Sequence, residues 1–555
     1  MDALETAFFY HEHTKHHPHR YARSLGYMDW ANQPNPFRRY EGAPLFLLPF
    51  PDPADSPAYD QLYLPEAIAS RPVQPHTLSA FLLNALGLSA SKEYHGNRWE
   101  LRCNPSSGNL HPSEGYLIQG GGEDLPAGVY HYAPREHGLE LRHAFSQEQW
   151  AALSGGFPSG TFFTGLISIH WREAWKYGER AYRYCNQDAG HAFAALSLSA
   201  AAQGWRLVEL DGLASGDIAA LLGLDRAEDY AGVERETPEF LAAVFPHTEH
   251  PGWPPQAIKL EGGIHDTLTG PWNGRANPLS ADHVPWDIID AVAAACGKPR
   301  TPGDAVSPSH LGKRDEEIAS TRGPTAYQIF QQRRSAVDMD GVTSISAAAF
   351  CGMLRRVMPA NAPPWYGLGR PPHIDLGLFV HRVDGLLPGL YCLQRNPDHA
   401  GELRASMHPH FTWQAAPDCE GLPLFLLHPV DCREAAADAS CHQDIAGDGA
   451  FSLGMLAKFE APLKQTGAWL YPRLFWEAGM IGQVLYLEAE AAGVRATGMG
   501  CYFDDVVHHL FGIRDRSFQS MYHFTVGGPV DDPRLRTLPP YDAQRRALRH
   551  VQEVL

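Results

Sequence analysis

Residues 104–118 read NPSSGNLHPSEGYLI, a polar, turn-rich stretch that runs into an apolar segment. Its residue types disfavour a helix or strand interior and favour a loop. Such a loop offers hydroxyls, an amide and backbone N–H groups to a bound molecule, so we take Pro105, Ser106, Ser107 and Asn109 as candidate ligand-binding residues. The corresponding stretch later in the chain, GLGRPPHID, contains no serine.

Two arginine-containing segments in the second half could bind a phosphate. Arg333, Arg334 and Ser335 are consecutive, and arginine makes bidentate, charge-assisted hydrogen bonds to phosphate oxygens. Taken alone, an Arg-Arg pair is more often a solvated helix face. Near the C-terminus, Arg534 and Arg536 could bring a second cationic group to the same phosphate.

A glycine pair in the second half could let the backbone approach a flat ring. Gly498 and Gly500 flank Met499 in the segment RATGMGCYFDD. Glycine permits this close approach because it has no Cβ atom. The alternative is a tight helix-to-strand turn with no ligand.

The elements that must position these residues are repeated. Residues 182–224 and 471–513 align without a gap at a constant offset of 289 residues, which pairs Ala189-Gly190 with Ala478-Gly479. Each copy predicts an apolar helix that ends at a glycine, an extended segment and a second short helix. Segments that resemble hairpins precede both copies.

The repeat predicts a duplicated α+β unit whose two copies pack as a pseudo-symmetric pair, like a fused homodimer. The alternative is two independent domains. We divide the chain into an N-terminal extension (1–60), a first domain (61–297), a linker (298–324) and a second domain (325–555).

Composition narrows the functional classes. A formal net charge of −18 argues against nucleic acid as the main partner. Nine cysteines without a C-x-x-C pair indicate a reduced, intracellular protein. No secretory signal or membrane-spanning run is evident, so we expect a cytoplasmic location and no membrane partner. The histidine-rich N-terminal segment lacks H-E-x-x-H spacing, and we expect no metal there.

The segments RCNPSSGNLHPSEGYLI, KYGERAYRYCNQDAGH and RRS…GMG…FDD resemble the nitroreductase superfamily, specifically its SagB-type dehydrogenase branch, over roughly residues 64–245 and 327–541. The resemblance implies an α+β sandwich, an intertwined dimer and FMN at the dimer interface. It implies that the R-R-S and glycine segments hold FMN from one subunit and the serine loop from the other. Here each half retains one of these parts, which predicts one composite site and one FMN per chain.

Lys176 and Tyr177 match the Lys-Tyr pair implied to transfer a proton in azoline dehydrogenases of this branch. The alternative is a surface lysine beside a packed tyrosine. Three functions follow: a dehydrogenase of a small heterocycle or peptide-derived azoline, an NAD(P)H-dependent reductase of nitro or quinone compounds, and a non-catalytic scaffold. Because the two halves already form a pair, the chain is compatible with a monomer. The sequence names neither the substrate nor the electron donor or acceptor.

Overall fold

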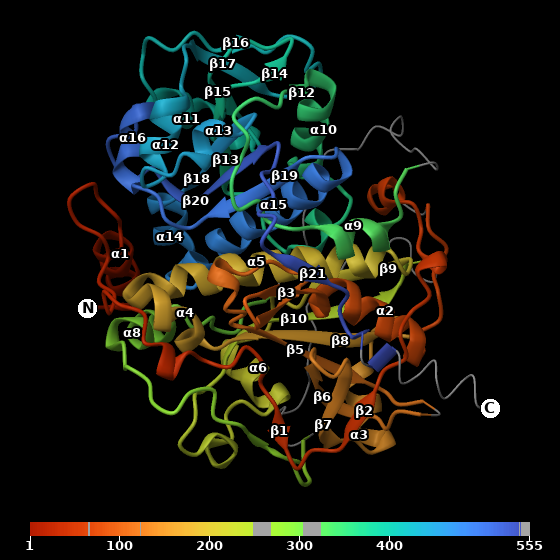
Figure 1. The fold of residues 1–555 in the computed structure, drawn as a ribbon. Helices are drawn as coiled ribbons and strands as arrows, with labels where there is room; N and C mark the ends of the chain where they lie inside the picture. The colour runs from red at the N-terminus through yellow and green to blue at the C-terminus, as the bar shows by residue number, and fades with distance from the viewer. Residues whose placement is uncertain (65–66, 123, 248–267, 303–322, 543, 546–555) are drawn as a thin grey trace.

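The fold is that of a computed structural model, which describes residues 1–64, 67–122, 124–247, 268–302, 323–542 and 544–545. Most of the predicted linker lies outside these ranges. Two seven-stranded sheets, two long helices between them and a three-stranded sheet that joins the halves make up most of the structure (Figure 1).

The first sheet is antiparallel and has the strand order β2-β7-β6-β5-β8-β10-β9. Its strand β2 lies inside the predicted N-terminal extension and pairs with β7. In spatial order the strands are β2 Leu45–Leu47, β7 Gly138–Ala144, β6 Gly128–Ala133, β5 Ser113–Gln119, β8 Phe162–Ser168, β10 Thr237–Pro246 and β9 Trp205–Glu209.

The second sheet is also antiparallel, with the order β16-β17-β15-β13-β18-β20-β19. From β17 to β19 this repeats the arrangement from β7 to β9 of the first sheet, whereas the edge strand β16 lies between β15 and β17 in the chain and β2 precedes all other strands of its sheet. Its strands are β16 Gln414–Ala415, β17 Leu424–Pro429, β15 Gly389–Leu393, β13 Ile374–Val380, β18 Phe451–Lys458, β20 Phe518–Gly527 and β19 Arg495–Met499.

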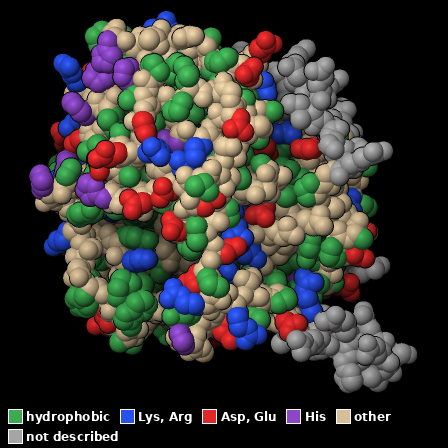
Figure 2. Space-filling model, turned by 45° about the horizontal axis from the view of Figure 1, so that its top comes forward, with side chains coloured by type: hydrophobic (Ala, Val, Ile, Leu, Met, Phe, Trp, Pro, Cys, Tyr) green, Lys and Arg blue, Asp and Glu red, His purple; other side chains and the backbone are tan. Residues whose placement is uncertain are grey.

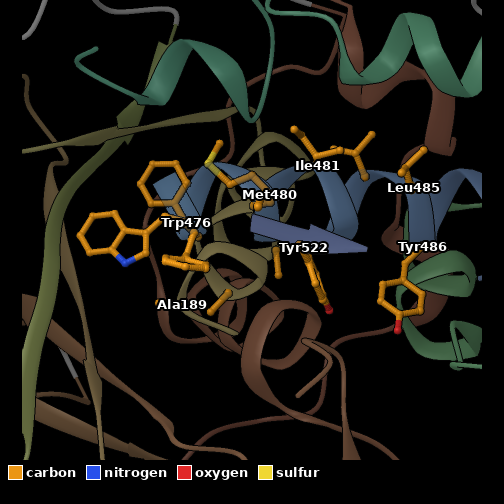
Figure 3. Close-up of a cluster of buried hydrophobic side chains, with 14 of the residues drawn as sticks. Ala189, Trp476, Met480, Ile481, Leu485, Tyr486 and Tyr522 are labelled. Carbon is orange, nitrogen blue, oxygen red and sulfur yellow. The ribbon is translucent and has the colours of Figure 1, made fainter. Parts of the chain in front are cut away.

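Helices α5 (Ala181–Ala201) and α15 (Leu470–Ala491) lie between the two sheets and pack along one another (Figure 1). Both are buried around almost their whole circumference, as expected for helices covered on every side. Figure 3 shows the apolar side chains of α15 here, from Trp476 to Tyr486, with Ala189 of α5 beside Trp476. The repeat therefore encodes the central layer.

The aligned glycines of the repeat end helices in the same way. Helix α6 (Ser215–Leu222) ends at Gly223 and helix α16 (Asp504–Phe511) at Gly512, with φ of 72° and 88°. Only glycine adopts this left-handed conformation at little cost, which explains why both copies have it there.

The halves exchange elements at their boundary. The C-terminal strand β21 (Arg536–Leu538) pairs antiparallel with β3 (Leu88–Tyr94) of the first half, which in turn pairs with β4 (Asn97–Arg102). Helix α9 (Ala326–Gln332) packs against α2 (Pro75–Leu86). Segments from both halves therefore surround the region between β4, α9 and β19.

The N-terminal helix α1 (Ala3–His13) joins the two halves. Its Tyr10 hydroxyl donates to the Glu179 carbonyl at 2.6 Å, and His11 Nε2 lies 3.1 Å from Gln519 Oε1. Arg183 Nη2 donates to the carbonyl of His11. The segment is thus part of the body rather than a solvated tail.

The remaining elements cover the sheets. They include two small pairings, β1 (Tyr40–Glu41) with β11 (Arg275–Ala276) and β12 (Ile345–Ser346) with β14 (Val383–Asp384). The other α-helices described are α3 Gln147–Ser154, α4 His170–Tyr177, α8 Asp287–Ala295, α10 Ala347–Val357, α11 Ala400–Ser406, α12 Arg433–Ala439, α13 Ile445–Asp448 and α14 Glu460–Thr466.

One expectation is wrong. Cys351 and Cys419 form a disulfide between α10 and the loop before β17, so not all nine cysteines are reduced. Within the described ranges, no helix combines the length and apolar character that a membrane span needs. On the face shown in Figure 2, basic and acidic side chains are interspersed.

Candidate functional site

The serine loop connects β4 to β5 in a strongly bent conformation. Gly108, Asn109 and His111 all have positive φ, at 61°, 58° and 52°. Ser107 anchors the loop to α5 by donating its N–H to both Asp188 carboxylate oxygens, at 3.1 and 3.2 Å. Ser106 Oγ accepts the N–H of His111 at 2.8 Å. The loop is preorganised by its own side chains.

Asn109 acts within the loop. Its Nδ2 donates to the Glu100 carbonyl at 2.9 Å, and its Oδ1 lies 2.9 Å from His111 Nε2. This amide therefore holds the loop against β4 through one donor and one acceptor contact.

The R-R-S segment follows α9 and runs beside β19. Ser335 forms a parallel bridge with Ala496, which brings the segment next to Gly498. Tyr486 of α15 connects the two: its hydroxyl lies 2.9 Å from Ser335 Oγ and accepts the Gly498 N–H at 2.9 Å. In Figure 3 the hydroxyl ends of Tyr486 and Tyr522 point to the same side.

One cavity of about 960 Å³ lies between these segments. Both halves line it. The predicted residues that line it are Pro105, Ser106, Ser107 and Asn109 from the first half, with Arg333, Arg334, Ser335 and Gly498 from the second. Segments more than 200 residues apart in the sequence thus meet in one place, where the intertwined arrangement predicts them.

The two arginines of the R-R-S segment are largely buried at this cavity. Arg333 is 4 % exposed, its Nη2 donates to the Arg102 carbonyl at 3.0 Å, and its Nε has no hydrogen-bond partner among the described residues. Arg334 Nη2 donates to the Ser89 carbonyl at 3.0 Å. Burial lowers the pKa of both, that of Arg334 to about 10 with a contribution from the charge of Arg333. An anion in the cavity would offset this cost.

Arg534 and Arg536 were expected here, and this expectation is wrong. Their side chains are 69 % exposed and pair with Asp532 at 2.7 Å and Glu93 at 3.1 Å. The cavity is lined instead by Leu535 and Thr537. Alternate residues of an extended strand face opposite sides, and the arginines occupy the outward positions. Lys92, Arg102 and Arg495 also line the cavity, and the sequence reasoning missed all three.

The three residues of the segment Gly498–Gly500 have different surroundings. A Cβ on Gly498 would lie 2.0 Å from the Tyr522 hydroxyl, so this glycine admits the tyrosine at the cavity wall. A Cβ on Gly500 would lie 1.8 Å from the Tyr184 ring, outside the cavity. Met499 is buried in an apolar cluster with Val507 and Phe511. Met499 and Gly500 therefore serve packing rather than lining the cavity.

Lys176 and Tyr177, at the end of α4, lie beside the serine loop. A Cβ on Gly108 would lie 2.8 Å from the Tyr177 hydroxyl and 3.3 Å from Lys176 Nζ. The Tyr177 ring lies 4.3 Å from that of Tyr184, centroid to centroid, and burial together with the charge of Glu173 raises the pKa of Tyr177 well above its ordinary value. Neither side chain lines the cavity itself; Gly108 stands between them and it.

The sequence reasoning also missed the two tyrosines and undervalued two residues of α5. Asp188 and His191 line the cavity together with Tyr486 and Tyr522. A signal existed for Tyr486, because its counterpart at the 289-residue offset is Ser197. A polar aromatic residue present in one copy alone was a detectable difference.

The related position on the other side of the pair is almost closed. Glu209 and Asp211 stand there at the offset positions of Gly498 and Gly500. Glu209 pairs with Arg370 at 2.6 Å, and Asp211 lies 3.9 Å from Lys298 Nζ. Another cavity, of about 50 Å³, is lined by Arg206 of β9, the counterpart of Arg495; neither Glu209 nor Asp211 lines it.

Residues 69–233 match the model of the nitroreductase family. No curated protein matches significantly. A protein from Anabaena variabilis assigned as a nitroreductase is similar in structure, with a TM-score of 0.67 and 21% sequence identity over 95% of this chain and 99% of that one. This likeness shows a nitroreductase-like fold over most of the chain.

Two further structures match over parts of the chain. One, from Ralstonia eutropha and also assigned as a nitroreductase, has 20% identity over 39% of this chain and 93% of that one, with a TM-score of 0.27. The other is the E. coli microcin synthetase McbBCD complex with truncated pro-MccB17 bound, with 22% identity over 33% and 66% and a TM-score of 0.25.

Proposed function

We propose that this chain is an FMN-dependent oxidoreductase with a single FMN site formed jointly by its two halves. The observation that carries the proposal is the cavity of about 960 Å³ that the serine loop and the R-R-S segment line together. The family match over residues 69–233 and the nitroreductase-like fold support an oxidoreductase of this kind.

The residues around the cavity fit FMN. Arg333 and Arg334 would hold the phosphate, and the unpartnered Nε of Arg333 is a donor that an anion would satisfy. Ser335 and the serine loop would contact the polar parts of the cofactor, and the backbone at Gly498 would approach its ring. FMN, when bound, supplies the site with a two-electron carrier.

One site per chain is favoured by the asymmetry of the pair. The cavity of about 50 Å³ at the related position is too small for a cofactor that needs several hundred Å³. Glu209 stands there where the proposed site has Gly498, so a charged side chain replaces the open backbone that would approach the cofactor ring.

For the reaction, we infer a SagB-type dehydrogenation of a small heterocycle or peptide-derived azoline. Lys176 and Tyr177 would position the substrate and relay the proton that it loses as it is oxidised. Their place beside Gly108 supports this role, because the serine loop separates them from the cavity by a single residue. Lys176 is exposed, so a substrate can reach it from solvent.

The FMN site is tested by titration of apoprotein with FMN, followed by flavin absorbance. Arg334→Gln is expected to weaken binding at least tenfold, since it removes a charged donor from the cavity. Arg534→Gln is the matched control: it removes an exposed arginine outside the cavity and should leave binding unchanged. Equal effects of the two variants would contradict the site.

The reaction is tested with Lys176→Ala. The proposal expects FMN binding to remain and azoline oxidation to fall at least a hundredfold, the usual contribution of proton transfer by a positioned group. If NAD(P)H-driven quinone reduction is fast in both proteins and no azoline is oxidised, the reductase alternative holds instead.

A further inference from the structure

Two buried carboxyl groups lie beneath the serine loop. Glu173 of α4 is 0 % exposed and Asp188 of α5 is 1 % exposed. Among the described residues, neither has a lysine, arginine or histidine nitrogen within 4.0 Å. Several other buried acids pair with arginines: Glu114 with Arg172 at 2.5 Å, for example. An unpaired buried carboxyl pair is therefore unusual in this molecule and calls for a function.

Both groups contact the loop. Besides accepting the Ser107 N–H, Asp188 accepts the Ser107 hydroxyl at 3.2 Å. Glu173 Oε1 accepts the Ser106 hydroxyl at 3.4 Å, while its Oε2 is buried without a hydrogen-bond partner in the described structure. Asp188 also lines the cavity. The pair thus holds the two serines, with Asp188 at the cavity wall and Glu173 away from it.

Two charges cannot be held together here. Burial and then the charge of Asp188 raise the pKa of Glu173 well above its ordinary value, while burial raises the pKa of Asp188 to about 7. Near neutral pH the two carboxyls therefore hold at least one proton between them, and the ionisation near pH 7 belongs to the coupled pair.

The tyrosines, the cysteine and the histidine that face the pair do not titrate between pH 6 and 8, whereas burial raises the pKa of Glu239, another acid near Cys185, to about 7. Lys176 supplies a positive charge near Glu173. Burial raises the pKa of the tyrosines and the cysteine well clear of neutrality, and burial with the charge of Arg333 lowers the pKa of His191 to about 3. The tyrosines and the cysteine are Tyr177, Cys185, Tyr486 and Tyr522.

We propose that Glu173 and Asp188 are positioning residues that share one proton beneath the serine loop and thereby make the loop's grip on its ligand dependent on pH. The ligand is taken to be FMN, and that part rests on the proposed function. With Asp188 ionised, the two Ser107 donors bind a charged acceptor, which makes stronger hydrogen bonds than a neutral one. When Asp188 takes up a proton, these bonds weaken and the loop is held less firmly.

The test measures the FMN dissociation constant at pH 6 and pH 8 for the wild type and two isosteric variants. Asp188→Asn fixes the neutral form, so it should bind about tenfold more weakly than the wild type at pH 8 and nearly equally at pH 6. Glu173→Gln leaves Asp188 without a carboxyl partner for the proton, so binding should stay strong to a lower pH than in the wild type. Asp505→Asn, at a half-exposed carboxylate that titrates far below pH 6, is the control.

The same variants have a readout that needs no cofactor. Since ionisation of Asp188 is disfavoured in the folded protein, the unfolding midpoint of the apo wild type should fall relative to Asp188→Asn as pH rises from 5 to 8. A constant difference at all pH values would overturn the shared proton. Failure of every protein to bind FMN, with this shift present, would refute the proposed function and leave the carboxyl pair standing.

Discussion

Helices α5 and α15 pack closely at Gly190 and Gly479, and Gly479→Ala tests this contact directly. A Cβ on Gly479 would lie 2.0 Å from the Gln187 carbonyl oxygen and 2.9 Å from Gly190 Cα. A Cβ on Gly190 would lie 2.1 Å from the Trp476 carbonyl oxygen. These neighbours are backbone atoms, so no side chain can turn aside to make room.

The magnitude follows from the distances. An ordinary carbon–oxygen contact is about 3.4 Å, so the helices must separate by about 1.4 Å at the crossing. Overpacking of this kind costs roughly 1–3 kcal/mol, and the gap opened along the helices loses further dispersion energy. The gain of alanine over glycine in a helix, about 1 kcal/mol, opposes it. We expect a net loss of about 2 kcal/mol.

The FMN site should respond as well. Asp188 and His191 flank Gly190 on α5, and Tyr486 faces the same cavity from α15. Separation of the helices would displace these groups from one another, so we expect the FMN dissociation constant to rise about tenfold or more, in line with a loss of about 1.4 kcal/mol.

The assay compares urea unfolding midpoints and FMN titrations of three proteins. Gly352→Ala in α10 is the matched control, because its Cβ would have no atom within 4 Å and should be neutral or slightly stabilising. If Gly479→Ala were as stable as Gly352→Ala and bound FMN like the wild type, the helices could not cross as closely as described.

Three further outcomes are expected. Asp504→Asn leaves two buried arginines without their charged partner and should lower the free energy of unfolding by about 3–5 kcal/mol. Asp532→Asn, beside an exposed arginine, should change it by less than about 1 kcal/mol. Thermal unfolding of both variants measures the difference. Burial opposes ionisation of Asp504, but its arginine partners lower its pKa below the ordinary value, so this stability is present above pH of about 4 and should be lost in acid titrations below it. Gly108→Ala would place a Cβ 2.8 Å from the Tyr177 hydroxyl at a backbone φ of 61°. Because both effects strain the serine loop, we expect FMN to bind about tenfold more weakly in a flavin titration. Wild-type affinity in this variant would contradict the described loop.

Much of the central layer could be predicted because it is local. The repeat placed the long helices, and the glycines at positions 204 and 493 follow their ends as expected. Periodicity and capping depend on neighbours in sequence, and these were visible. The meeting of the serine loop with the R-R-S segment depended on the family resemblance, since no spacing in the chain encodes it.

The features that the sequence did not predict are contacts between residues far apart in the chain and the register of one strand. The pairing of β21 with β3 joins residues more than 400 positions apart, and a shift of one residue decides whether Arg536 or Thr537 faces the cavity. Sequence alone fixed neither. The contact between the Asp188 carboxyl and Ser107 forms only after folding, so the sequence alone does not reveal that Asp188 belongs to the site.

The flavin-to-chain ratio of purified protein saturated with FMN tests the central claim most directly. Absorbance gives the ratio, and mass spectrometry after denaturation identifies the cofactor. The account predicts one FMN per chain, lost in Arg334→Gln and kept in Arg534→Gln. Two FMN per chain would show that the position filled by Glu209 and Asp211 also binds, and none would contradict the FMN site altogether.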